Sequence, residues 1–123
     1  MAVTRSYSND KLTHFALRDG AVTNVPINNV CGGACTVYSM EIHNNATGGL
    51  RYFKIWDHLS PEVGVTIPDF VFEVADNFKN IVTFPEGISF ATGLSYACTL
   101  TSADNNNVSP GTTILISMVA KVG

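Results

Sequence analysis

The chain has 123 residues, which is the length of one domain. The net charge is −3 and no basic run occurs, so binding to nucleic acid through its phosphates is not expected. No apolar run approaches the roughly 18 residues of a membrane span, and the first residues lack the apolar stretch of a signal peptide. If this is a full chain, we expect it to fold in a cytosol and to bind no membrane. Only 14% of the residues are charged, which suggests that other protein covers part of the surface.

The N-terminal region is predicted to hold an arm and a hairpin. Residues 1–10 are polar and are expected to form an arm or a frayed end, ahead of a single β-domain over residues 11–123. The arm could reach onto a neighbouring subunit. Two short apolar runs, Leu12 to Arg18 and Ala21 to Ile27, flank the turn dipeptide Asp19-Gly20 and predict a hairpin at the start of the domain.

Alternation of apolar and polar residues predicts four strands in the middle of the chain, separated by turns rich in Gly, Asn and Pro. They cover residues 35–44, 50–57, 70–75 and 78–84. A longer loop with two prolines precedes the third of them. The second strand, LRYFKIWD, is apolar on both faces, so Tyr52 and Trp56 are expected to point outward when Phe53 and Ile55 face the core.

The stretch from Phe84 to Thr101 contains the clearest strand pattern in the chain. Pro85-Glu86-Gly87 predicts a turn, and Thr92-Gly93 predicts a second break. Residues 94–101 then alternate strictly, which predicts one face in the core and the other facing a more polar surrounding. The last strand, residues 112–122, alternates as well and places Leu115 and Val119 on its second face.

These elements predict an all-β fold of about eight antiparallel strands. No stretch longer than one turn has helical periodicity with caps. Short strands at even spacing indicate a sandwich, a jelly roll or a small barrel, and we favour a single-domain jelly-roll-like β-sandwich. An immunoglobulin-like sandwich is the main competitor, but Trp56 lacks the flanking pair of cysteines that this fold uses.

The cysteines do not form a recognisable reactive motif. Cys31 and Cys35 have C-x3-C spacing, which is neither the redox spacing nor half of a standard zinc site, so free thiols are expected. A local disulfide and a metal ligand are the alternatives. Cys98 falls on the apolar face of its strand and is expected to be a small core residue.

No other residue set predicts catalysis. The carboxylates are scattered, no serine lies in a G-x-S-x-G turn, and the paired glycines lack the lysine and the helix of a phosphate loop. The loop from Asp104 to Asn107 has oxygen ligands for Ca²⁺, but a solvated turn is the favoured interpretation. We therefore expect no catalytic residue, no cofactor and no metal.

A protein interface is the candidate site. Tyr52 and Trp56 are residue types enriched at interfaces, and Leu115 and Val119 would extend the same patch. The alternative is that a loop or the N-terminal arm buries both faces of strand 50–57 within one sandwich.

Three segments, YFKIWD, the loop from Pro61 to Pro68, and FPEGISFATGLSYACTLTSAD, carry a family resemblance over about residues 35–123. The chain resembles the small all-β virion proteins of tailed bacteriophages. The matching residues are Tyr52, Lys54, Trp56, Asp57, Pro61, Val63, Gly64, Pro68, Gly87, Phe90, Thr92, Gly93, Leu94, Tyr96, Ala97 and Thr99. Ile67, where the family more often has Thr, and Asn105 to Asn107 depart from the pattern within loops.

The resemblance implies a structural role in a virion. The expected function is that of a capsid decoration, or cement, protein. It would bind the major capsid protein on the outer surface of the head, stabilise contacts between coat subunits, form a homotrimer, and be assembled in the host cytoplasm. The alternatives are a tail, neck or fibre-associated protein, or a carbohydrate-binding β-sandwich module that uses Tyr38, Tyr52 or Trp56 to stack on a sugar. An enzyme is the least expected outcome.

Overall fold

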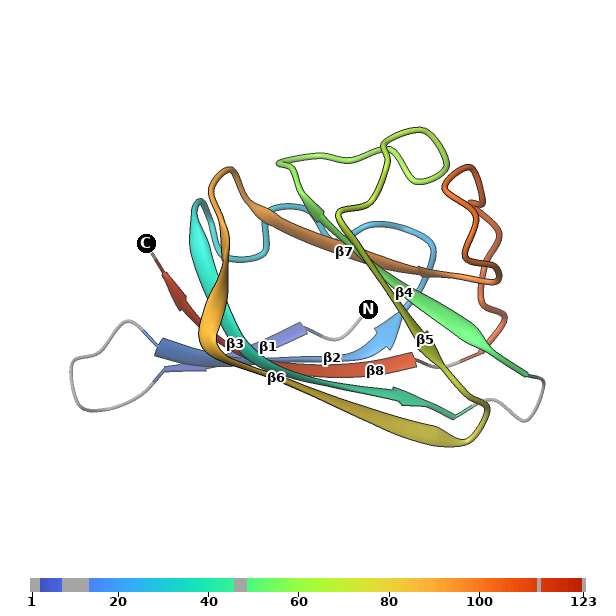
Figure 1. Cartoon of the computed structure of the whole chain (residues 1–123), viewed down its shortest axis with the longest axis horizontal. Coiled ribbons are helices and arrows are strands. Elements are labelled where there is room, and N and C mark those ends of the chain that lie inside the picture. Colours follow the sequence, from blue (N-terminus) through green and yellow to red (C-terminus); the bar gives the residue numbers. More distant parts are fainter. Residues whose placement is uncertain (1–2, 8–13, 46–48, 113, 123) are drawn as a thin grey trace.

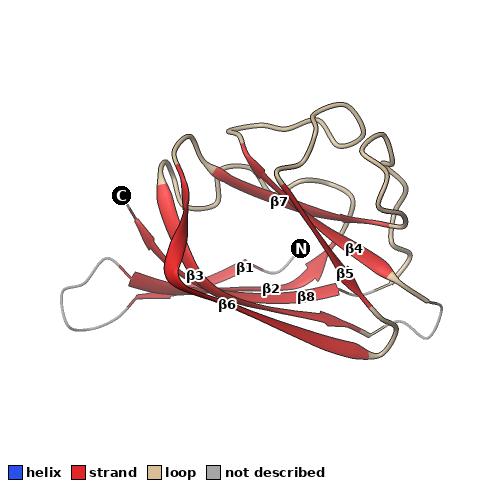
Figure 2. Ribbon diagram, viewed as in Figure 1, coloured by secondary structure: helices blue, strands red, loops and turns tan. Residues whose placement is uncertain are grey.

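The structure, a computed structural model, describes residues 3–7, 14–45, 49–112 and 114–122. All regular secondary structure in these residues is β-strand (Figure 2). The strands are β1 (Val3–Tyr7), β2 (His14–Val22), β3 (Cys35–Asn44), β4 (Arg51–Asp57), β5 (Phe70–Val74), β6 (Phe78–Phe90), β7 (Leu94–Thr99) and β8 (Ile114–Val122).

The strands form two antiparallel sheets that face each other as two layers (Figure 1). The larger sheet has the order β1-β2-β8-β3-β6, and the smaller sheet has the order β5-β4-β7. The prediction of an all-β sandwich of about eight antiparallel strands is therefore confirmed. The larger sheet is centred on β8, which comes last in the chain, so the fold is complete only when the C-terminal strand is in place.

The core lies between the two layers and is lined by alternate residues of both sheets. Its most completely buried apolar side chains include Phe15, Leu17, Val37, Ile42, Phe53, Ile55, Leu94, Tyr96, Ile114 and Ile116. Cys98 belongs to the same cluster, as predicted. Because alternate residues face the core, the intervening residues of each strand face outward, and these outer faces hold the candidate sites.

Strand β7 differs from the prediction because both of its faces are buried. The segment at residues 23–30 runs along its free edge: Ile27 and Tyr96 pair as an isolated bridge, and the Cys98 amide donates to the Thr23 carbonyl at 2.9 Å. The polar face is covered by loops, and its Ser95 hydroxyl donates to the His58 carbonyl at 2.6 Å. Polar residues on a strand thus reflect hydrogen bonds to loops here, not exposure to water.

The predicted turn at Pro85-Glu86-Gly87 is wrong, because these residues lie inside the continuous strand β6. The register between β3 and β6 shifts there, from Val37 opposite Ile88 to Ser39 opposite Thr83, so the extra residues form a bulge. Gly87 has a φ of +79°, and a Cβ at this position would collide with the Thr36 side chain. The Pro and Gly signals therefore mark an edge-strand bulge rather than a chain reversal.

The predicted turn at Asp19-Gly20 is also wrong, because β2 passes through it. The Asp19 side chain is buried and accepts hydrogen bonds from the Tyr96 hydroxyl at 2.9 Å and from the Ala21 amide at 3.0 Å. These bonds compensate for burying a carboxylate. The first hairpin is instead β1 with β2, so residues 3–7 of the expected arm form the edge strand of the larger sheet. The rest of residues 1–10 lies outside the described part of the chain.

Candidate interaction surfaces

Trp56 lies on the outer face of β4 but is only 1% exposed. Its indole Nε1 donates to the Thr66 carbonyl at 2.8 Å, which places the side chain beneath the loop at residues 58–69. That loop is ordered by its own bonds: the Thr66 amide donates to the Glu62 carbonyl at 2.8 Å, and the Glu62 amide donates to the Thr66 hydroxyl at 3.0 Å. Trp56 is therefore an anchor for a loop and is not available to a partner. Burial of this face by a loop was the alternative to an interface in the sequence analysis.

Lys54 is a second buried residue on the same face. Its ammonium donates to the Ala103 carbonyl at 2.7 Å and to the Asn106 carbonyl at 3.4 Å. Burial lowers the pKa of Lys54, and the nearby Asp104 carboxylate opposes that change. One carbonyl group of the loop considered for Ca²⁺, that of Asn106, and the Ala103 carbonyl just before it are thus directed at a lysine ammonium, which supports the favoured interpretation of a turn.

Asp57 ends β4 and binds a third loop. Its carboxylate accepts hydrogen bonds from the backbone amides of Ala91 at 3.1 Å, Thr92 at 2.9 Å and Gly93 at 3.1 Å. Burial raises the pKa of Asp57, but the three backbone hydrogen bonds outweigh it, so the pKa lies below its ordinary value. The Thr92-Gly93 break between β6 and β7 is consequently held by a side chain that is distant in sequence.

Lys54, Trp56 and Asp57 belong to the YFKIWD segment, and each fixes a different loop. The segment that contributes to the family resemblance is therefore mainly architectural. Its Lys54 and Trp56 side chains are covered by these loops, and the exposed residues in this region are therefore at the tip of the loop at residues 58–69. Val65 and Ile67 are each 69% exposed, although the loop that carries them is well hydrogen-bonded. This loop tip was not among the sites that we predicted.

The four predicted interface residues do not form one patch. Tyr52 is half-buried on the outer face of the smaller sheet, where Trp56 is covered. Leu115 and Val119 lie on the outer face of the larger sheet, on the opposite side of the sandwich. The sequence predicted which residues point away from the core, but it could not predict that they belong to different sheets.

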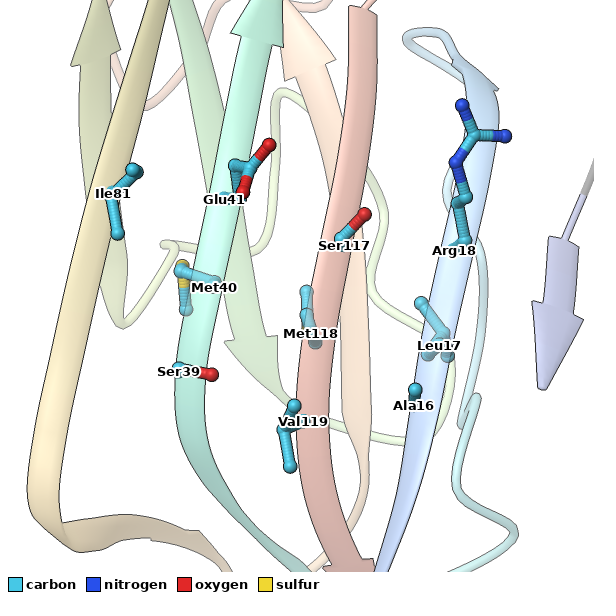
Figure 3. A pocket seen from close by; sticks show the side chains of 10 residues that line it. All are labelled: Ala16, Leu17, Arg18, Ser39, Met40, Glu41, Ile81, Ser117, Met118 and Val119. Carbon is cyan, nitrogen blue, oxygen red and sulfur yellow. The ribbon is translucent and has the colours of Figure 1, made fainter. Parts of the chain in front are cut away.

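The outer face of the larger sheet carries a shallow depression of about 580 Å³ (Figure 3). Small side chains from three strands lie at its floor, namely Ala16, Ser39 and Ser117. Longer or apolar side chains surround them. Ile81 is 66% exposed and Val119 is 41% exposed.

Two opposite charges of this face, Arg18 and Glu41, flank the central strand. Arg18 on β2 is paired in register with Ser117 on β8, and Ser117 is paired with Glu41 on β3. Figure 3 shows Arg18 and Glu41 on either side of Ser117. Glu41 also forms an ion pair of 3.0 Å with Lys79. The row formed by Arg18, Ser117 and Glu41 results from the pairing of strands that are distant in sequence, so local sequence patterns do not reveal it.

The three cysteines are free thiols and all are buried. A hydrogen bond with the Cys31 thiol, followed by burial, raises the pKa of Cys35 far above its ordinary value. Burial raises the pKa of Cys98 to about 12. Buried, protonated thiols are poor nucleophiles and poor metal ligands.

No family model matches the chain, and no curated protein is similar to it in sequence. In the described residues, no helix has the length and apolar character to cross a membrane. The same residues contain no cluster of three or more His, Cys, Asp or Glu side chains placed to hold a metal ion.

Proposed function

We propose that the chain is a structural virion protein, a capsid decoration protein that binds the outer surface of a tailed-phage head and stabilises contacts between coat subunits. Its partner would be the major capsid protein of the same particle. The order of the strands is the observation that carries this proposal. The trimer implied by the family resemblance remains a prediction.

The strand order agrees with a jelly roll. We count the segment at residues 23–30 as an irregular strand beside β7, because the Ile27 and Tyr96 amides and carbonyls exchange hydrogen bonds of 2.9 and 3.1 Å. One sheet then contains β2-β8-β3-β6, and the other contains residues 23–30 followed by β7-β4-β5. Jelly rolls of this kind are common in viral capsid proteins and in lectins.

The loop at residues 58–69 supplies a surface suited to a coat contact. Its apolar tips, Val65 and Ile67, are exposed, and its backbone is fixed on Trp56 before any partner arrives. A rigid apolar loop loses little conformational entropy on binding, which favours stable attachment. We propose that this loop packs against the coat subunit.

Cryo-EM of intact particles is the test. Density for this chain over the whole icosahedral shell, with Val65 and Ile67 against the coat, is the expected result. Density confined to the portal vertex or the tail would refute decoration and would favour the alternative of a tail, neck or fibre-associated protein.

A loss-of-function test uses the same loop. The variant Ile67→Asp should bind capsids assembled without the protein at least tenfold more weakly, because burying an unpaired carboxylate at an interface costs more than about 1.4 kcal/mol. Val71→Asp, which also places an aspartate at an exposed apolar position, is the control. Capsids that withstand heat and low salt equally well with and without the wild-type protein would contradict the cement role.

The carbohydrate-binding alternative gains no support from the three aromatic residues on which it depended. Tyr38 and Tyr52 are half-buried, and Trp56 is buried beneath the loop at residues 58–69. A sugar ring needs an exposed aromatic face for stacking. A glycan array with purified protein would detect binding through any other surface.

A further inference from the structure

We propose that the outer face of the larger sheet is a self-association surface, on which a second copy of this chain docks face to face around a two-fold axis that runs along β8. This proposal goes beyond the decoration function, does not depend on it, and is an alternative to the homotrimer implied by the family resemblance. It commits to a second copy because the charges beside Ser117, those of Arg18 and Glu41, are complementary to themselves.

Symmetry of the sheet is the first argument. β8 is the middle strand of five, with β2 and β1 on one side and β3 and β6 on the other. A two-fold axis parallel to β8 therefore places β2 of one copy over β3 of the other, and β8 over β8. Such an isologous contact uses the same surface twice, which is the commonest way for soluble proteins to pair.

Register of the charges is the second argument. Arg18 and Glu41 are both in register with Ser117, one strand away on either side, at the strand spacing of about 4.8 Å. With the axis over Ser117, Arg18 of each copy faces Glu41 of the other. The symmetric pair thus gains two opposite-charge contacts beside Ser117, against one like-charge approach of the two copies of Lys121 at the exposed end of β8.

The residues around this row fit the same arrangement. Val119 lies on the axis, where the two copies of this exposed side chain would meet. Ala16 and Ser39 are both in register with Val119, so a small side chain of one copy faces a small side chain of the other. The depression of about 580 Å³ leaves room for the two sheets to interdigitate. Ile81, on β6, would be covered by β1 of the second copy.

The size of the face is sufficient for a specific contact. β8 has nine residues, so a face of five strands measures at most about 30 Å by 24 Å, or roughly 700 Å² per copy. The total of about 1,400 Å² lies within the range of stable interfaces, about 1,200 to 2,000 Å². We expect this pairing to be weaker at high salt, because the charged contacts are screened.

Sedimentation velocity over a concentration series tests the proposal with the full chain. The wild-type protein should sediment as a dimer at high concentration. Arg18→Glu alone and Glu41→Arg alone should each weaken dimerisation at least about tenfold, because each creates two like-charge contacts. The double variant, with both charges exchanged, should recover the dimer. Circular dichroism and thermal unfolding confirm that each variant is folded.

A second pair of variants tests the apolar part of the face. Val119→Lys should abolish the dimer, whereas Val71→Lys should not. Val71 is a matched control, because it is a strand valine of similar exposure, 38% against 41%, on the other sheet. A protein that stays monomeric throughout the series, a trimer, or a dimer that tolerates both single charge reversals would overturn the proposal. Loss of the dimer in Val71→Lys alone would assign self-association to the smaller sheet.

Discussion

Three residues of β4 bind separate loops, and each uses a different chemical group. The Lys54 ammonium binds the loop after β7, the Trp56 indole binds the loop after β4, and the Asp57 carboxylate binds the turn before β7. These groups form hydrogen bonds with backbone amides and carbonyls of the loops, which lack the partners that a strand ladder supplies. At this scale, the three residues of the YFKIWD segment support the fold rather than a binding site.

Replacement of Asp57 by Asn should destabilise the protein by about 1 to 2 kcal/mol at neutral pH, because an ionised acceptor of backbone hydrogen bonds becomes a neutral one. The folded-state pKa lies below the ordinary value of 3.8. The carboxylate therefore stabilises the fold above that pH, and the benefit is lost as the pH falls through the folded-state pKa. Urea unfolding at several pH values should show the wild type and the variant converging in acid. Asp76→Asn, in an exposed turn, is the control and should change little.

Replacement of Trp56 by Phe should lower the free energy of unfolding by about 1 to 3 kcal/mol, because the Thr66 carbonyl loses its donor and a small cavity opens. Limited proteolysis should then cut the loop at residues 58–69 faster. Tyr52→Phe, on the same face of β4 but half-buried, should stay within about 0.5 kcal/mol of the wild type. Equal effects of the two changes would contradict the role of Trp56 as an anchor.

At the scale of the elements, the bulge in β6 decides where the long edge strand bends. Four residues of β6 separate the positions that pair with Val37 and Ser39 of β3, and Gly87 among them has a positive φ. Glycine is required there both by its backbone conformation and by the nearby Thr36 side chain. The sequence pattern of Pro and Gly is the same for a bulge and a turn, and only the strand partner distinguishes them.

Gly87→Ala and Gly111→Ala separate these two requirements. Both glycines have a positive φ, +79° and +66°, so both changes should cost about 1 kcal/mol or more through backbone strain. A Cβ meets nothing within 4 Å at Gly111, whereas at Gly87 it collides with Thr36. Chemical denaturation should therefore show a larger loss of stability for Gly87→Ala. An equal loss of stability in the two variants would mean that the bulge adjusts to the added Cβ at Gly87 without further cost in free energy.

At the scale of the whole molecule, the two layers bury the thiols from three separate parts of the chain. Cys31 lies in a loop, Cys35 begins β3 and Cys98 lies in β7, yet all three face the common core. Reaching any of them from solvent requires the layers to separate.

Reaction with a thiol reagent at neutral pH should accordingly be slow in the native state and fast in denaturant. The thiols are buried, and the pKa values of Cys35 and Cys98 are raised, so few thiolates are present to react. Mass spectrometry after brief alkylation should find no adduct on the native protein and three on the unfolded protein. Rapid modification of Cys31 or Cys35 alone would show that their loop opens independently of the core.

Local sequence patterns determined most of the strands of this protein, but not all of their limits, since β2 and β6 run through predicted turns and β1 was expected to be an arm. Period-two alternation predicted the all-β class, a strand that begins at residue 94 and the burial of Cys98, because alternate residues of a strand necessarily point to opposite faces. Tertiary structure alone decided what each face meets. Trp56 is covered by a loop, and Arg18 aligns with Glu41 through Ser117, because pairing between distant strands and loop packing set these contacts. No nearby residue in the chain encodes such pairing.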